Sequence, residues 1–113
     1  MQRLLMIHSF SVMVLGVTAD RLEQLVDEVV TRCFSNLFGS RAAKAINSYL
    51  NPRLAAENPS EYTSQLRRLT GEKSSEVMLR RIEDLLCEKV GLQKREWRNL
   101  AECVEAVRSK CAI

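Results

Sequence analysis

A doubled unit in the sequence restricts the fold more than any other feature of this chain. Residues 34–50 (FSNLFGSRAAKAINSYL) and residues 66–82 (LRRLTGEKSSEVMLRRI) align at an offset of 32 positions. Each copy predicts a helix that ends on an apolar residue, a glycine that turns the chain, and a second helix that starts at once. The equivalent pairs are Phe34 and Leu66, Leu37 and Leu69, Gly39 and Gly71, Ile46 and Met78, and Leu50 and Ile82. This repeat predicts an architecture, but it does not indicate any chemistry.

The composition agrees with an all-α domain. The chain has 113 residues, of which 46% are hydrophobic and only 5% aromatic, so the core must rest on Leu, Val, Ile, Met and Ala, a mixture that favours helices. Four glycines and two prolines leave little material for long loops. We therefore expect residues 1–113 to form a single domain, a compact bundle or orthogonal array of five to six helices. Within it, residues 1–18 would form an apolar N-terminal helix or arm and residues 20–113 the helical core.

Helix boundaries can be placed from local signals. Asp20 and Glu23 form a capping box before an apolar stripe over residues 21–38, and Gly39 is expected to end that helix in the left-handed conformation. Ser40 is expected to cap a second helix, which Pro52 ends. Asn58-Pro59 starts a third helix, which runs to about Leu69. A fourth spans about residues 73–90, and a last helix is expected from about residue 94, with Trp97 on its apolar face.

The first 18 residues, MQRLLMIHSFSVMVLGVT, are predominantly apolar. They are too short for a membrane span, which needs about 20 apolar residues. As a helix or arm they would expose apolar surface, which favours a homodimer. The candidate self-association residues are Leu4, Leu5, Ile7, Phe10, Val12 and Val14. The alternative is a secreted protein in which residues 1–19 form a signal peptide, although His8, Ser9 and Ser11 interrupt the apolar run.

The cysteines and the single histidine give little support for an enzyme or a metal centre. Cys33, Cys87, Cys103 and Cys111 include no C-x-x-C pair, which argues against a zinc site. Cys33, Cys87 and Cys103 fall on or beside apolar helical stripes, where a thiol acts as a small hydrophobe. His8 lies inside the N-terminal apolar run. We therefore expect a reduced, cytoplasmic protein that is not an enzyme and that uses no metal and no cofactor.

A group of basic residues offers a different function. Arg67, Arg68, Lys73, Arg80 and Arg81 lie around the second repeat unit and could contact phosphate groups, for example through a helix-turn-helix. The net charge of +3 is low for a nucleic-acid-binding domain, and a solvated helix face explains the same residues.

Several short motifs resemble one family of proteins. The order F-x-x-L-F-G-x-x-A, then N-P-x-E-Y-x-x-x-L-R-x-L-x-G, then I-x-x-L-C-E-K-x-G-L is similar to that of a small all-helical archaeal domain. Its members are stand-alone proteins and output domains of signalling chains. The resemblance covers roughly residues 22–108 and rests on Phe38-Gly39, Asn58-Pro59, Leu66, Leu69, Gly71 and Gly91-Leu92. It implies a protein-binding or signal-relay module and assigns no catalytic residue.

The sequence therefore predicts a non-enzymatic module for protein–protein interaction or signal output, which associates with itself and with a protein partner. The alternative is a nucleic-acid-binding regulator that uses the region from Arg67 to Arg81.

Overall fold

A computed structural model of the chain describes residues 21–112, with side chains through residue 110, and over that range the protein is all-α. Residues 21–38 are helical, and five labelled helices follow them. These are α2 (Ser40–Tyr49), α3 (Leu54–Glu57), α4 (Pro59–Thr70), α5 (Glu72–Val90) and α6 (Leu100–Ala112). The predicted fold class, a compact helical array of five to six helices, is confirmed for this part of the chain.

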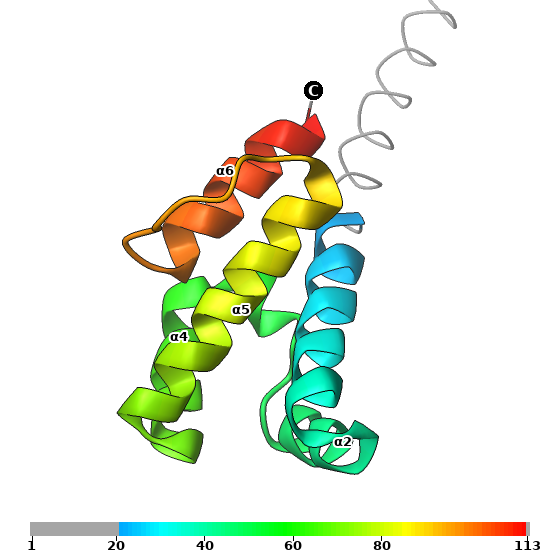
Figure 1. Cartoon of the computed structure of the whole chain (residues 1–113), viewed down its shortest axis with the longest axis vertical. Helices are drawn as coiled ribbons and strands as arrows, with labels where there is room; N and C mark the ends of the chain where they lie inside the picture. Colours follow the sequence, from blue (N-terminus) through cyan, green and yellow to red (C-terminus); the bar gives the residue numbers. More distant parts are fainter. Residues whose placement is uncertain (1–20, 113) are drawn as a thin grey trace, which may run out of the picture.

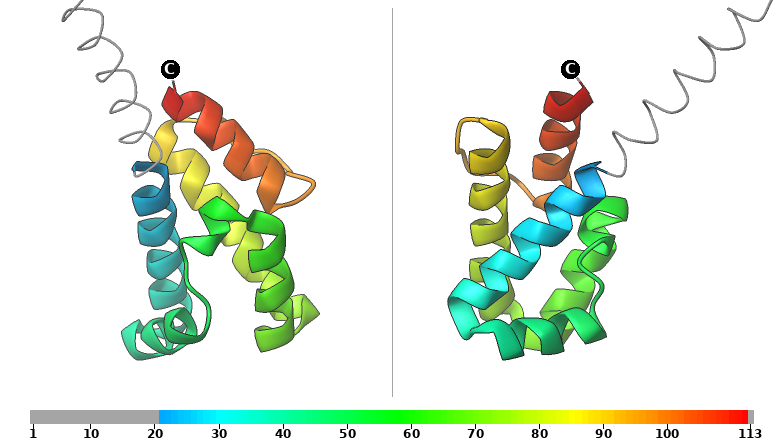
Figure 2. Two further views of the ribbon diagram at one scale, coloured as in Figure 1. Left: turned by 180° about the vertical axis from the view of Figure 1, so that it is seen from behind. Right: turned by 90° about the vertical axis from the view of Figure 1, so that its right-hand side faces the viewer.

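The helices form an array in which the chain turns twice at the same end of the molecule. The 21–38 helix descends to the lower end of the molecule in Figure 1, α2 crosses that end, and α3 lies higher up. From there α4 descends again and α5 climbs beside it (Figure 1; Figure 2). Helix α6 packs against both α5 and α4. The two glycine corners of the repeat therefore lie at one end of the protein.

The apolar stripes of the helices meet in a single core. The 21–38 helix contributes Val26, Val30, Cys33 and Phe34, each fully buried, at the three- and four-residue spacing that the sequence shows. Tyr62 and Leu66 come from α4, and Ile82 and Leu86 from α5. Helix α6 adds Leu100, Val104 and Val107. Each such side chain contributes about 1.5–3 kcal/mol on burial, so these stripes fix which helix faces meet.

The start of α4 forms as its local sequence predicts. The Asn58 side chain accepts a hydrogen bond from the Glu61 backbone N–H at 3.3 Å, and Pro59 occupies the first turn, where its missing N–H costs nothing.

The corner at Gly39 differs from the expected left-handed helix end. Its φ is +92° and its ψ is 163°, an extended conformation with positive φ that is essentially restricted to glycine. The reason is that no residue separates the two helices. The Gly39 N–H closes the 21–38 helix on the Ser35 carbonyl, and its own carbonyl accepts the first bond of α2 from the Ala43 N–H. The expected left-handed conformation occurs at Gly91, the end of α5 (φ +74°, ψ 26°).

The expectation that the last helix begins near residue 94 is wrong, because α6 begins at Leu100. Residues 92–97 form an irregular loop, and Trp97 packs half-buried against the core from that loop. The helix starts where a cap is available: the Asn99 side chain accepts a hydrogen bond from the Glu102 N–H at 2.9 Å. Lys94 to Trp97 offer no such cap.

The predictions for residues 1–18, including self-association through Leu4 to Val14 and the alternative signal peptide, fall outside the described residues, as does the side chain of Cys111. Among the helices that can be described, none combines the length and the apolar character needed to cross a membrane.

Candidate binding surface

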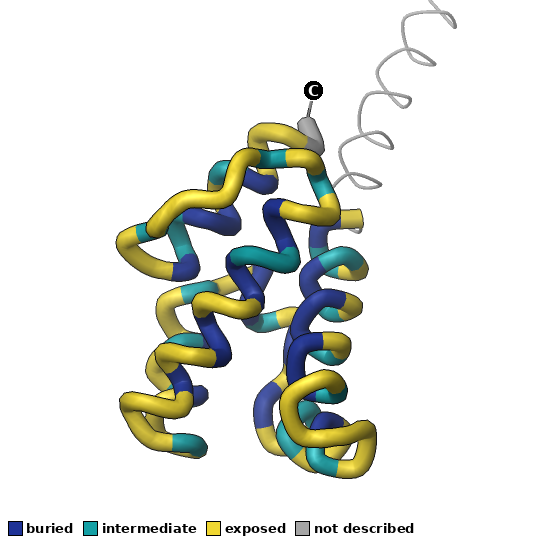
Figure 3. The backbone as a smooth tube through the Cα atoms, in the orientation of Figure 1, coloured by how far each residue is buried: buried dark blue, intermediate teal, exposed yellow. Residues whose placement is uncertain are grey.

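Exposed apolar side chains gather at the end of the molecule that carries the two glycine corners. Within the described residues, five large hydrophobic side chains are exposed: Leu37, Phe38, Tyr49, Leu69 and Val77. Leu37 and Phe38 precede Gly39, Leu69 lies just before Gly71, and Val77 lies in the second turn of α5. Tyr49 ends α2 and is 80% exposed. Both corners are coloured as exposed in Figure 3.

A groove runs between the ends of α2 and α4 at this end of the protein. It has a volume of about 350 Å³ and is lined by Tyr49, Leu50, Gln65, Arg68 and Leu69. Tyr49 and Leu69 form exposed walls, whereas Leu50 is buried. The groove joins the end of α2 to the last turns of α4, just before the Gly71 corner.

Basic side chains lie on the helices at this end of the molecule, and Arg68 lines the groove itself. Arg41 and Lys44 project from the exposed side of α2, Arg67 and Arg68 from the last turns of α4, and Lys73 from the start of α5. All five are exposed, and none forms an ion pair within the part of the chain that the structure describes. We refer to these cations, together with Leu37, Phe38, Tyr49, Leu69 and Val77, as the basal surface.

The structure separates the five basic residues that the sequence grouped together. Arg67, Arg68 and Lys73 lie on the basal surface. Arg80 lies farther along α5 and forms ion pairs with Glu76 (3.9 Å) and Glu96 (3.5 Å). Arg81 lies on another side of α5, near enough to Cys33 for its charge to act on that thiol. A single phosphate-contacting face therefore does not include all five.

Arg41, Lys44 and Tyr49 were not among the sequence candidates. A signal for them exists in the sequence, because residues 29–56 contain no Asp or Glu at all. In a chain with 17 basic and 14 acidic residues, an acid-free stretch that includes a whole helix indicates a surface of one charge.

A larger groove of about 560 Å³ lies beside the 21–38 helix. Six of its seven lining residues are polar or charged, and they carry both signs of charge: Asp27, Glu28, Val29, Thr31, Arg32, Ser35 and Lys89. A ligand site normally combines an apolar lining with a few placed polar groups. Val29 is the one apolar side chain of this groove, and its remaining apolar surface comes from the aliphatic parts of the polar and charged residues, which indicate no single ligand chemistry.

The buried thiols are poor candidates for nucleophiles. Burial raises the pKa of the Cys33 thiol to about 11, although the charge of Arg81 opposes the rise. Burial, followed by the adjacent Cys87 thiol and the Glu83 carboxyl, also raises the pKa of Cys103. A raised pKa disfavours the reactive thiolate. Cys33, Cys87 and Cys103 are therefore suited to packing.

Glu83 is the one buried acidic side chain among the described residues. It is only 7% exposed. Burial raises the pKa of its carboxyl to about 7, with Asp84 and Glu102 adding to the rise and Arg80 opposing it. General acids often have such a pKa. Neither the groove at Tyr49 nor the larger groove beside the 21–38 helix is lined by Glu83, so neither offers this carboxyl a substrate.

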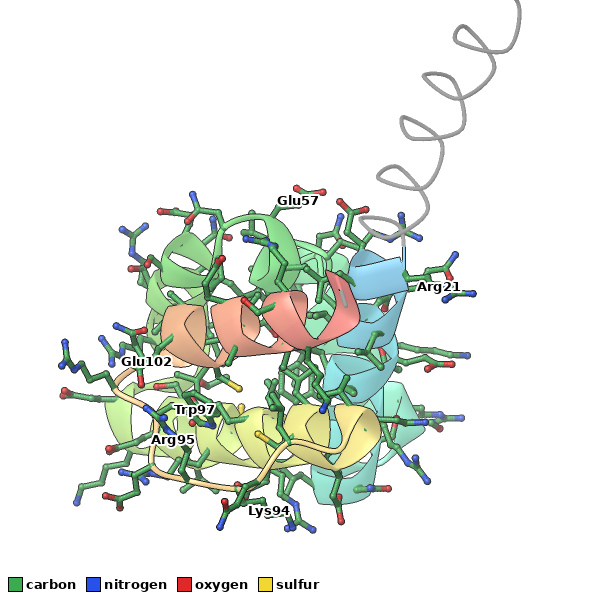
Figure 4. The ribbon with its side chains drawn as sticks, turned by 90° about the horizontal axis from the view of Figure 1, so that it is seen from above. Arg21, Glu57, Lys94, Arg95, Trp97 and Glu102 are labelled. Atoms are coloured by element: carbon green, nitrogen blue, oxygen red, sulfur yellow. The ribbon has the colours of Figure 1, made fainter. Side chains whose placement is uncertain are left out.

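The 91–99 loop is held against the helices by polar contacts at the end opposite the basal surface. Figure 4 shows Arg95 beside Trp97, with Glu102 of α6 near both. The Arg95 guanidinium lies 4.3 Å from the centre of the Trp97 ring, and its Nη2 donates to Glu102 Oε1 at 2.9 Å. The loop is thus anchored to α6, and its Trp97 is part of the core rather than an exposed contact residue.

Among residues 21–112, no three His, Cys, Asp or Glu side chains are close enough together to hold a metal ion. His8 is not among the described residues.

Comparison with known proteins gives no relative: no family model, no curated protein and no solved structure matches this chain. The resemblance to the archaeal domain family therefore stays a prediction.

Proposed function

We propose that this protein is a non-enzymatic interaction module that binds another protein through its basal surface. The observation that carries the proposal is the concentration of exposed Leu37, Phe38, Tyr49 and Leu69 at one end of the bundle, where Tyr49 and Leu69 line a groove. Exposed apolar side chains that gather around a groove and are surrounded by polar residues are typical of protein-binding surfaces. Tyrosine and arginine, both present in this groove, are enriched at binding hot spots.

The buried polar groups support the same proposal. The three described thiols have no exposed surface, and burial raises the pKa of two of them, Cys33 and Cys103, which disfavours the thiolate. The basal surface offers apolar side chains and cations, which suit binding rather than catalysis.

Photo-crosslinking tests the proposal directly. Tyr49 is replaced by p-benzoylphenylalanine in the full chain, and the protein is irradiated in the cells that produce it. We expect one discrete adduct with another polypeptide, because a hydrophobic partner segment would cover Tyr49. The matched control places the crosslinker at Arg98, which is 89% exposed on the 91–99 loop. Equal adducts from both positions, or none from Tyr49, would contradict a binding role for the basal surface.

Nucleic acid is the second candidate partner, favoured by the unpaired cations Arg67, Arg68 and Lys73. A gel-shift assay across a salt series separates the two. Phosphate contacts would give binding that weakens steeply with salt and that Arg67→Ala/Arg68→Ala abolishes. Absence of binding at low salt would remove this candidate.

A further inference from the structure

We propose that the basal surface recognises an acidic amphipathic segment of its partner, placing an apolar side chain of that segment in the groove and its carboxylates on the surrounding cations. This inference rests on the proposed function and names the chemistry of the partner. Three features support it: the charge of the surface, the shape of the groove and the sequence of the chain's own N-terminal run.

The charge of the basal surface is far from balanced. Arg41, Lys44, Arg67, Arg68 and Lys73 carry five positive charges, and the segments that carry the surface, residues 37–50 and 65–77, contain two carboxylates, Glu72 and Glu76. The net charge of the whole chain is also +3, so the rest of the molecule is neutral. Of the eleven other exposed cations among the described side chains, six have carboxylate partners, as Arg80, Lys94, Arg95 and Arg108 do. The basal cations lack them, which leaves their charge available to a partner.

The cations and the apolar groups are interleaved, so one partner segment would meet both. Arg68 and Leu69 are adjacent in α4 and line the same groove as Tyr49. An arginine guanidinium such as that of Arg68 binds a carboxylate through two parallel hydrogen bonds. A helix with an apolar stripe and acidic flanks matches this arrangement, since helix-in-groove recognition uses apolar anchors at intervals of one turn.

A concave site favours a peptide over a lipid surface or a nucleic acid. A membrane is flat and is bound by protruding side chains, whereas Leu50 forms a buried part of the groove. Phosphate backbones offer no apolar group for Leu37, Leu69 or Leu50. A peptide matches both features, because an apolar side chain of the peptide would enter the groove and neighbouring carboxylates would pair with the cations.

The chain's own N-terminal run does not meet these requirements. Residues 1–18 contain no Asp or Glu, and they carry Arg3. Placing this run on the basal surface of the same or a second copy would add positive charge to an already positive face, which is unfavourable. The partner segment is therefore expected from another protein.

Selection from a random peptide library displayed on phage tests the inference on the full-length chain. We expect the selected peptides to be enriched in Asp and Glu next to Leu, Phe or Trp. The best peptide is then synthesised, and its affinity is measured by fluorescence anisotropy for four proteins: the unchanged chain, Arg68→Glu, Tyr49→Ala and Arg98→Glu. Circular dichroism confirms that each variant keeps its helices; all three positions are exposed, so folding is expected to be retained.

Support for the inference requires acidic peptides that Arg68→Glu weakens about tenfold or more, because the reversal places like charges together. Tyr49→Ala must weaken them as well, and Arg98→Glu must leave them unchanged. If the selected peptides show no acidic enrichment but still lose affinity on Tyr49→Ala, the acidic partner is overturned and the proposed function is kept. Peptides insensitive to both basal variants, or no selected peptide, would overturn both.

Two further measurements cover the other occupants. Vesicles of phosphatidylserine and phosphatidylcholine are sedimented with the protein, and its mass is measured by light scattering. Vesicle binding abolished by Arg68→Glu would replace the inference with a lipid surface. An oligomer dissociated by Tyr49→Ala would replace it with a second copy of this chain.

Discussion

Gly39 and Gly71, 32 residues apart, adopt the same backbone conformation: φ is +92° and ψ is 163° at Gly39, and φ is +90° and ψ is 165° at Gly71. Each glycine closes one helix through its N–H and opens the next through its carbonyl. The repeat that the sequence shows is therefore a repeat of two equivalent corners, and it brings the ends of four helices to one end of the protein.

This equivalence predicts equal effects of substitution at the two corners. Gly39→Ala and Gly71→Ala should each lower the free energy of unfolding by about 1–3 kcal/mol, because a Cβ is disfavoured at this positive φ. No atom lies within 4 Å of the position that either Cβ would take, so the cost comes from the backbone alone. Urea denaturation measures it. Ser40→Ala is the matched control, since Ser40 is exposed and Gly39 occupies the N-cap of α2, and it should change stability by less than about 0.5 kcal/mol. A Gly39→Ala effect no larger than that of the control would contradict the argument.

Tyr62 offers an unusual opportunity for stabilisation. Its ring is fully buried, and its hydroxyl has no hydrogen-bond partner within the described structure. A buried hydroxyl without a partner costs about 1–3 kcal/mol, so Tyr62→Phe should leave stability unchanged or raise it within that range. Thermal unfolding followed by circular dichroism checks this, with Tyr49→Phe as the exposed control. A clear fall in the melting temperature for Tyr62→Phe would mean that the hydroxyl is satisfied.

Glu83 should make stability depend on pH. Burial raises the pKa of its carboxyl from 4.5 to about 7 in the folded protein, so the folded state holds this proton more tightly than the unfolded state does. The contribution of Glu83 to stability is therefore fully present below about pH 4.5 and is lost as the pH rises through about 7.

The neutral variant Glu83→Gln should remove this decline. We expect it to be more stable than the unchanged protein at pH 8, and to show a flatter dependence of the free energy of unfolding between pH 5 and 8. The measurement is urea denaturation at several pH values, and Glu28→Gln, at an exposed position, is the control. Parallel pH curves for the unchanged chain and Glu83→Gln would show that Glu83 does not titrate in this range.

The contact between Arg95 and Trp97 should be visible in fluorescence, because Trp97 is the only tryptophan of the chain. Arg95→Ala removes both the guanidinium 4.3 Å from the ring centre and the bond to Glu102. We expect a shifted Trp97 emission and a loss of about 0.5–1 kcal/mol of stability, the range for a cation–π contact near the surface. Arg98→Ala is the matched control, since Arg98 lies 3.9 Å from the same Glu102 but is 89% exposed. Identical spectra for both variants would argue against the stacking.

Local signals in the sequence were sufficient for the helices and the repeat. The Asn58-Pro59 start, the apolar stripe over residues 21–38 and the correspondence of Gly39 with Gly71 each depend on residues within a few turns of one another. The start of α6 was predicted too early, because the apolar spacing of Trp97 with Leu100 continues a helical pattern through a loop. The cap at Asn99 and the contacts of Arg95 determine where the helix begins.

The residues of the basal surface could not be grouped correctly from the sequence alone. The sequence placed Arg67, Arg68, Lys73, Arg80 and Arg81 together because they are close along the chain. In space, Arg41 and Lys44 join the first three, while Arg80 pairs with acids and Arg81 lies on another side of α5. The sequence by itself determined the helices, their caps and the two glycine corners, since these depend on local backbone preferences. Only the tertiary structure decided which cations and exposed apolar groups share one surface, because that depends on which helix faces are buried against one another.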